Sequence, residues 1–203
     1  MRINKDTKLF ISLSSKPSNF GTFIYNECFK RYNLNCIYKS FGSSNIKESI
    51  KAVRSLEIAG CSISMPFKEK VIDYLDDIDP IALKLSSVNT IQNVSGRLKG
   101  YNTDYCGAKK LISIMKLNQN DKILLIGMGA ISRTVFNILN NNNLKNIYIT
   151  NRSKKNILKF KKLGNFEFIN NKDINNFKFD VIINATPVGM NPHKEKIPCT
   201  KFS

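Results

Sequence analysis

Short apolar runs alternate with amphipathic stretches along the first half of the chain, which is typical of a mixed α/β domain. The runs at residues 8–13, 35–39 and 60–64 predict strands. Helices are predicted at residues 18–32 and 44–56, because apolar residues recur there at helical spacing. This alternation indicates a domain in which helices cover a central sheet.

The second of these helices has a polar start and one apolar face. Ser44 is placed to cap it, and its apolar positions repeat every three or four residues: Ile46, Ile50, Val53 and Leu56. A further helix is predicted at residues 68–75 and ends near Asp79-Pro80. Two strands at residues 88–92 and 97–100 bracket Ser95-Gly96, and this pattern predicts a hairpin.

The second half of the chain follows a strand–helix–strand rhythm with buried-type strands. Helices are predicted at residues 130–140 and 153–163, between the strands at residues 121–127, 146–150, 166–169 and 179–184. This order favours a doubly wound parallel sheet of the Rossmann type. We therefore expect two domains, residues 1–104 and 105–203, with residues 105–118 forming a helix that connects them.

Composition narrows the class of protein. The 203 residues are 42% hydrophobic, and no apolar run approaches the roughly 20 residues that span a bilayer. The N-terminus lacks the apolar segment of a signal peptide. Five cysteines without a C-x-x-C pair favour free thiols, so we expect a soluble cytoplasmic protein. His193 is the single histidine, which argues against a Ser-His-Asp triad and a multi-histidine metal site.

The formal net charge of +17 has two interpretations. The lysines are scattered and accompany abundant Asn and Ile, a composition that arises when a genome drifts toward A and T. A polyanion-binding surface is the alternative. The sequence carries no zinc-finger spacing and no basic-helix block, so no nucleic-acid partner is expected. A basic surface also suits small anionic ligands, so the charge does not argue against an enzyme.

Three polar segments follow apolar strands and carry candidate chemistry. They are Ser62–Lys68, Ser87–Thr90 and Gly100–Asp104. Lys68 and Asp104 form a candidate acid/base pair, because an ammonium needs a fixed carboxylate to hold it and tune its proton affinity. A surface lysine at a helix start and an aspartate in an Asn-Thr-Asp turn are the structural alternatives.

The second half carries a candidate nucleotide site. The glycine loop from Gly127 to Ser132 follows a strand and opens a helix, where bare N–H groups hold a pyrophosphate. Ser132 stands where the full fingerprint has Gly or Ala, and a purely structural turn is an equal alternative. The next strand ends in Asn151-Arg152, without an acidic residue, and arginine suits the 2′-phosphate of NADP. Otherwise, Arg152 is a solvated helix-start residue.

These motifs occur in one order along nearly the whole chain. They are Ser12-Leu13-Ser14, Ser64–Glu69, Ser87–Thr90, Gly100–Asp104, the Gly127 loop, Asn151–Ser153 and Asn184–Met190. On these motifs the chain resembles the shikimate dehydrogenase family, and in Met65-Pro66-Phe67 its dehydrogenase-like branch. The resemblance implies an N-terminal substrate-binding and catalytic domain followed by an NADP-binding domain of the Rossmann type.

The resemblance also implies an activity and a set of roles. The activity is reversible hydride transfer between shikimate and 3-dehydroshikimate, with NADP as cofactor. Lys68 and Asp104 are implied as the catalytic pair. Residues implied to bind the substrate are Ser12, Ser14, Ser64 and Asn89. Residues implied to bind NADP are Gly127, Gly129, Ala130, Asn151, Arg152, Thr186 and Met190.

One departure from the family keeps alternatives open. Family members continue beyond the position of Ser203, so the Rossmann-type domain is expected to be incomplete, with an exposed sheet edge. A weakly active or non-catalytic protein that binds NADP or substrate is one alternative. A quinate/shikimate dehydrogenase is another, and a polyanion-binding protein is a third. The expected partner is a small molecule, and the protein is expected to be a monomer or homodimer away from membranes.

Overall fold

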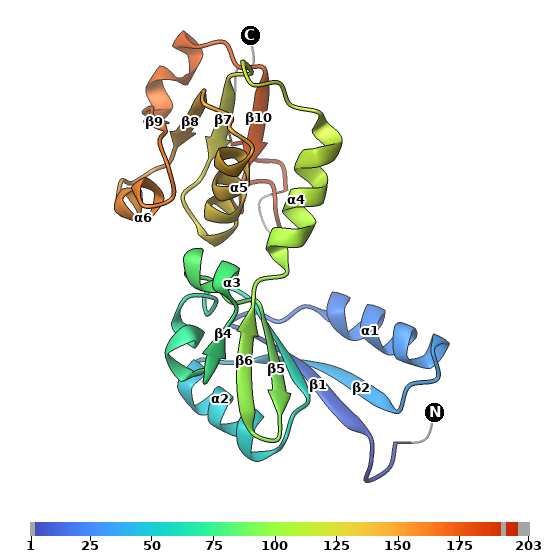
Figure 1. The fold of residues 1–203 in the computed structure, drawn as a ribbon. Coiled ribbons are helices and arrows are strands. Elements are labelled where there is room, and N and C mark those ends of the chain that lie inside the picture. Colours follow the sequence, from blue (N-terminus) through green and yellow to red (C-terminus); the bar gives the residue numbers. More distant parts are fainter. Residues whose placement is uncertain (1–2, 192–193, 199–203) are drawn as a thin grey trace. The chain divides into compact units, whose positions relative to one another are not determined.

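The computed structural model describes residues 3–191 and 194–198, so His193 and Cys199 lie outside the described residues. The chain divides into two compact units, Met1–Thr103 (unit 1) and Asp104–Ser203 (unit 2) (Figure 1). Within the described ranges, no helix combines the length and apolar character needed to cross a bilayer. Each unit is described by itself below.

Unit 1 is built on a six-stranded mixed sheet with the order β2-β1-β3-β5-β6-β4. Strand β1 pairs in parallel with β2 and β3, whereas β5 is antiparallel to both β3 and β6. The predicted strands and hairpin are therefore present. The bounds are β1 (Lys8–Ser14), β2 (Cys36–Gly42), β3 (Gly60–Ile63), β4 (Asp77–Ile78), β5 (Thr90–Val94) and β6 (Arg97–Tyr101).

Helix α2 (Ile46–Ser55) buries the apolar face that its spacing predicts, through Ile46, Ile50 and Val53. The cap differs from the prediction by one position. Asn45 occupies the N-cap, and its side chain accepts the N–H of Glu48, so Ser44 is not the capping residue. Helix α1 (Asn19–Arg31) lies along β2, where the Asn26 side chain bonds both backbone groups of Tyr38 at 2.9 Å.

Two expectations about residues 68–84 are wrong. The predicted helix at 68–75 is only the short 3₁₀ helix η1 (Lys70–Tyr74). Asp79-Pro80 starts a helix, α3 (Pro80–Lys84), where the sequence suggested a helix end. The Asp79 carboxylate accepts the N–H groups of Ile81 and Ala82, and proline fits the first helical position because it has no N–H to satisfy.

Unit 2 contains a four-stranded, fully parallel sheet with the order β10-β7-β8-β9. The strands are β7 (Ile123–Ile126), β8 (Ile147–Thr150), β9 (Glu167–Phe168) and β10 (Val181–Asn184). Because β8 and β10 lie on opposite sides of β7, the strand order reverses between β7 and β10. That reversal is where doubly wound sheets bind ligands, and the arrangement confirms the predicted Rossmann-type sheet.

The helices of unit 2 are α4 (Asp104–Met115), α5 (Ala130–Asn141), α6 (Ile157–Lys161) and the 3₁₀ helix η2 (Asn171–Asn176). Helix α5 lies over the sheet beside α4 (Figure 1), and its middle turns are completely buried. Phe136 of α5 stacks on Phe160 of α6 with ring centroids 5.6 Å apart. Helix α6 is much shorter than the predicted 153–163, since it begins only after Asn156.

Candidate active site

Two serines of β1 lie near its carboxyl end. Ser12 pairs in register with Ser62 of β3 and is partly buried. Ser14 is only 8% exposed, and its carbonyl accepts the N–H of Ser43 at 2.8 Å. The backbone of Ser12 is therefore fixed by β3 and that of Ser14 by the residue after β2, and both serines lie near the carboxyl end of β1.

The segment that carries Lys68 is anchored on the same edge. The N–H of Ser64 donates to the Leu13 carbonyl at 2.9 Å, and the peptide bond between Met65 and Pro66 is cis. The side chain of Ser64 is exposed, whereas Phe67 is buried and fastens the turn to the core. The Lys68 carbonyl accepts the N–H of Val88 at 2.8 Å, so the main chain of Lys68 lies beside the residue before Asn89.

Asn89 is held by the Asn-Thr-Asp turn. Its Oδ1 accepts the backbone N–H of Thr103 at 2.8 Å, and its Nδ2 donates to the Thr103 hydroxyl at 3.0 Å. Thr90 adds a hydroxyl bond to Asn89 Oδ1 at 3.0 Å. This double attachment, which the sequence did not reveal, fixes the residue directly before Asp104 to the start of β5.

A buried polar residue and a glycine pack next to the Asn-Thr-Asp turn. Asn102 is 6% exposed and donates to the Ser87 carbonyl at 2.9 Å. A Cβ on Gly100 would come within 2.5 Å of Leu75 Cδ1 and 2.9 Å of Val88 Cγ2, so a side chain there would force both neighbours to shift. Unit 1 thus brings Ser12, Ser14, Ser64, Lys68 and Asn89 to strand ends that share one edge of the sheet, because β5 runs opposite to β3 and begins at the edge where β3 ends.

The glycine loop of unit 2 has the backbone that its sequence suggests. Gly127 has a φ of +114°, and a Cβ there would meet Thr186 Cγ2 at 2.9 Å and the Ala185 carbonyl oxygen at 3.0 Å. Gly129 occupies the N-cap of α5, and a Cβ on it would meet nothing within 4 Å. The loop is therefore closed on one side and open at the helix start, where Ala130 begins α5.

Ser132 occupies the third glycine position of the dinucleotide-binding fingerprint, and its hydroxyl has a hydrogen-bond partner there. Its Oγ is buried and donates to the Gly127 carbonyl at 2.6 Å. The hydroxyl therefore closes the loop, where the glycine or alanine of the fingerprint would only leave space. The sequence signal for this bond is a small hydroxyl residue five positions after the first glycine.

Asn151 and Arg152 follow directly on β8. The Asn151 amide donates to the Ser153 carbonyl at 2.8 Å, and the Arg152 side chain is exposed. On the other side of β7, Asn184 shapes the loop after β10. Its Oδ1 accepts both the N–H and the hydroxyl of Thr186, at 3.0 and 2.7 Å, while Met190 is 56% exposed. The loops after β7, β8 and β10 therefore meet at the carboxyl edge of this sheet.

Electrostatic shifts occur outside these strand ends. The Arg54 guanidinium, 2.7 Å from Asp76, and the Leu98 N–H hold the pKa of the Asp76 carboxyl below its usual value. Burial raises the pKa of the Cys61 thiol, which keeps it protonated and unreactive. Cys106, at the start of α4, is exposed and has no disulfide.

The geometry defines a class of two-domain protein. An α/β unit with polar residues at the ends of its strands is joined to a Rossmann-type unit whose glycine loop is open at the start of a helix. Residues 18–91 match the shikimate dehydrogenase substrate binding domain, and residues 119–197 match the family described as C2185-like, N-terminal. These matches fall in unit 1 and unit 2 respectively.

Known proteins give the same assignment over most of the chain. The chain is 41% identical to a shikimate dehydrogenase-like protein of Haemophilus influenzae, covering 96% of this chain and 71% of that protein. It is 37% identical to a shikimate dehydrogenase (NADP(+)) of Methanosphaera stadtmanae, covering 90% and 69%. A shikimate dehydrogenase solved in complex with NADP⁺ superposes with a TM-score of 0.82 at 30% identity, over 98% of this chain and 74% of that one. The chain belongs to the shikimate dehydrogenase family, in its dehydrogenase-like branch.

Proposed function

We propose that the protein is an NADP-dependent oxidoreductase that interconverts shikimate and 3-dehydroshikimate. Unit 1, with Asp104 at the boundary, is the substrate-binding and catalytic part, and unit 2 binds NADP. The observation that carries the proposal is the attachment of Asn89 to Thr103, beside the backbone bond from Val88 to Lys68. Through these bonds, three separate segments present their polar residues at one sheet edge.

The residues of unit 2 fit a dinucleotide. Gly129 leaves open space at the first turn of α5. The first N–H groups of a helix have no intrahelical partner and favour a pyrophosphate. We assign Gly127, Gly129 and Ala130 to the pyrophosphate and Asn151 and Arg152 to the 2′-phosphate. Thr186 and Met190 are assigned to the nicotinamide end. When bound, NADP accepts or supplies the hydride.

The residues of unit 1 handle the substrate and its proton. Ser12 and Ser14 hold the carboxylate through their hydroxyls, while Ser64 and Asn89 hold the ring hydroxyls. In the reducing direction, the Lys68 ammonium donates a proton to the alkoxide oxygen that develops on the ring carbon. In the oxidising direction, the Lys68 amine takes that proton back. Asp104 holds the lysine in place and tunes its proton affinity for the transfer.

The test is an absorbance assay of purified protein, with shikimate as substrate and NADP and NAD measured side by side. We expect NADPH to form and the rate with NADP to exceed that with NAD. Quinate in place of shikimate distinguishes a quinate/shikimate dehydrogenase. No reduction of either cofactor at any shikimate concentration contradicts the proposal.

A second candidate is a weakly active or non-catalytic protein that binds NADP or substrate. The likeness to the Haemophilus influenzae shikimate dehydrogenase-like protein, at 41% identity, favours it, because that name does not assign an activity. Calorimetric binding of NADP together with no turnover identifies this candidate. Turnover at ordinary enzyme rates, on the order of 1–10³ per second, excludes it.

A further inference from the structure

The side chain of Asn156 does not cap the helix at whose start it lies. Asn156 is the N-cap of α6, a position where asparagine normally accepts an N–H of the first helical turn. It makes no such bond. Instead, its Nδ2 donates to the carbonyl of Met128 at 2.9 Å. The amide therefore reaches back to another loop and leaves its own helix uncapped.

Met128 lies in the centre of the glycine loop, between Gly127 and Gly129. Its side chain is only 2% exposed, so its carbonyl belongs to a well-packed part of the loop. The bond from Asn156 consequently joins the pyrophosphate loop to the segment after β8. That segment begins with Asn151, whose amide donates to the Ser153 carbonyl at 2.8 Å, and continues with Arg152.

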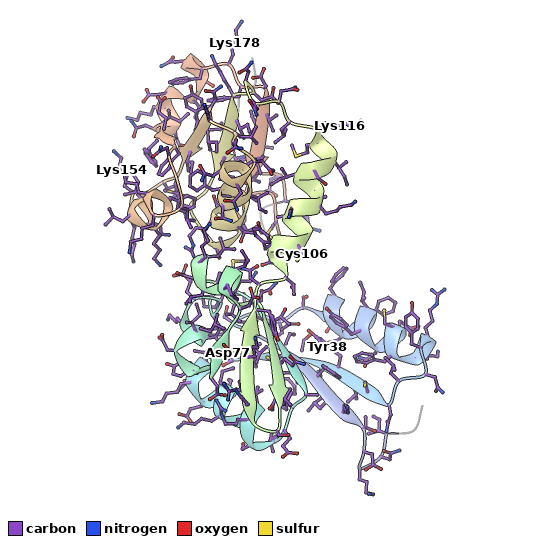
Figure 2. The ribbon with its side chains drawn as sticks, in the orientation of Figure 1. Tyr38, Asp77, Cys106, Lys116, Lys154 and Lys178 are labelled. Carbon is purple, nitrogen blue, oxygen red and sulfur yellow. The ribbon has the colours of Figure 1, made fainter. Side chains whose placement is uncertain are left out.

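The segment that Asn156 fastens is strongly basic. Between Asn151 and Phe166 the sequence has six cations and no acidic residue: Arg152, Lys154, Lys155, Lys159, Lys161 and Lys162. Lys154 stands beside α6 in Figure 2, and its ammonium lies 5.2 Å from the centre of the Phe168 ring. These exposed cations repel one another, so the turn that carries Arg152 needs a fixed attachment to keep its position.

We propose that Asn156 is a positioning residue for cofactor selectivity. By bonding Met128, it holds the Arg152 turn at a set distance from the glycine loop, so that one ligand meets both with its pyrophosphate and its 2′-phosphate. The inference rests on the proposed NADP site. It predicts that the bond matters for NADP, which needs both loops in register, and much less for NAD, which lacks the phosphate.

The test measures the dissociation constants of NADP and NAD by calorimetry for four variants. Asn156→Ala removes the bond, and Asn156→Ser keeps a good helix cap but is too short to reach Met128. Asn156→Gln retains an amide donor. Asn175→Ala, at an exposed asparagine of η2, is the matched control.

We expect both Asn156→Ala and Asn156→Ser to weaken NADP binding about three- to tenfold, the value of one hydrogen bond, and NAD binding less than about twofold. Asn156→Gln should recover part of the selectivity, and Asn175→Ala should match the wild type. Equal weakening of both cofactors, or a wild-type result for Asn156→Ser, overturns the positioning role in favour of simple helix capping. Wild-type protein that binds no NADP overturns the proposed function as well, whereas wild-type binding with an unchanged Asn156→Ala overturns the positioning role alone.

Discussion

The two units prepare their sites with different chemical groups. Unit 1 fixes side chains, as the paired bonds between Asn89 and Thr103 show. Unit 2 offers backbone groups to a ligand, since Gly127 and Gly129 carry no side chain that would cover the loop and the start of α5. Proton transfer requires one functional group at one place, whereas a pyrophosphate is held by any array of N–H donors. In unit 1, a substitution should therefore act by removing a functional group. In unit 2, it should act by adding atoms that cover the backbone.

The largest effects are expected at the proposed catalytic pair, of which Asp104 is the carboxylate. Asp104→Asn keeps the shape of the side chain and removes its charge, so it removes the carboxylate that is proposed to hold Lys68 and to tune its proton affinity. We expect kcat with shikimate and NADP to fall about 10²- to 10⁴-fold, the usual contribution of acid–base catalysis. Steady-state kinetics measure this, with the exposed Asp73→Asn as control. A kcat within twofold of wild type contradicts the assignment, as a rough limit.

Substitutions at the two glycines of the loop, Gly127 and Gly129, should affect two different properties: stability and NADP binding. Gly127→Ala places a Cβ against Thr186 and Ala185 at a left-handed φ, so it should lower the free energy of unfolding by about 1–3 kcal/mol. Gly129→Ala meets open space and should leave stability unchanged while weakening NADP binding, because the methyl group faces the proposed pyrophosphate. Urea unfolding and calorimetry distinguish these outcomes. Equal stability loss in both variants shows that the open space at Gly129 is filled.

A buried polar residue in α5 offers a smaller effect of opposite sign. Asn137 is fully buried, and neither polar atom of its side chain has a hydrogen-bond partner among the described residues. Asn137→Leu has a similar shape and removes the cost of burying these atoms, so it should stabilise the protein by about 1–3 kcal/mol. Thermal unfolding measures the gain. A destabilised variant shows that a partner, such as a buried water, satisfies the amide.

The smallest effect concerns Asp76 of unit 1. Its pKa is lowered by Arg54 and the Leu98 N–H, so folding favours the ionised carboxylate. That stabilisation is present above the ordinary carboxyl pKa of about 3.9 and is lost as the pH falls through the lowered folded-state value. Asp76→Asn should cost at most about 1 kcal/mol at neutral pH, because the pair is more than one-third exposed. The difference from wild type in urea unfolding should shrink below pH about 4. A constant difference contradicts the ion-pair explanation.

Most of the fold follows from hydrophobic periodicity. The strands and the buried face of α2 were predictable because apolar spacing records burial directly. Asp79-Pro80 was misread, since proline both ends and begins helices, and only the capping bonds to Ile81 and Ala82 decide between these. Helix α6 was predicted too long because lysines favour helices, whereas the helix spans only Ile157–Lys161.

The candidate site was predictable only as a set of residue types at strand ends. The sequence marks Asn89 and Asp104 as polar positions, but it does not show that Asn89 bonds Thr103. Such bonds join residues far apart in the chain, and their partners depend on strand register. Gly100 shows the same limit, because only the packed structure reveals that a side chain there would push against Leu75 and Val88.

The proton-transfer role of Lys68 is tested most directly by one comparison of rates. Lys68→Ala and the control Lys70→Ala, an exposed lysine of η1, are assayed for NADPH formation with saturating shikimate and NADP. The account predicts that Lys68→Ala loses about 10²- to 10⁴-fold in kcat while still binding NADP with wild-type affinity, and that Lys70→Ala behaves as wild type. Equal kcat values for the two variants would contradict the account.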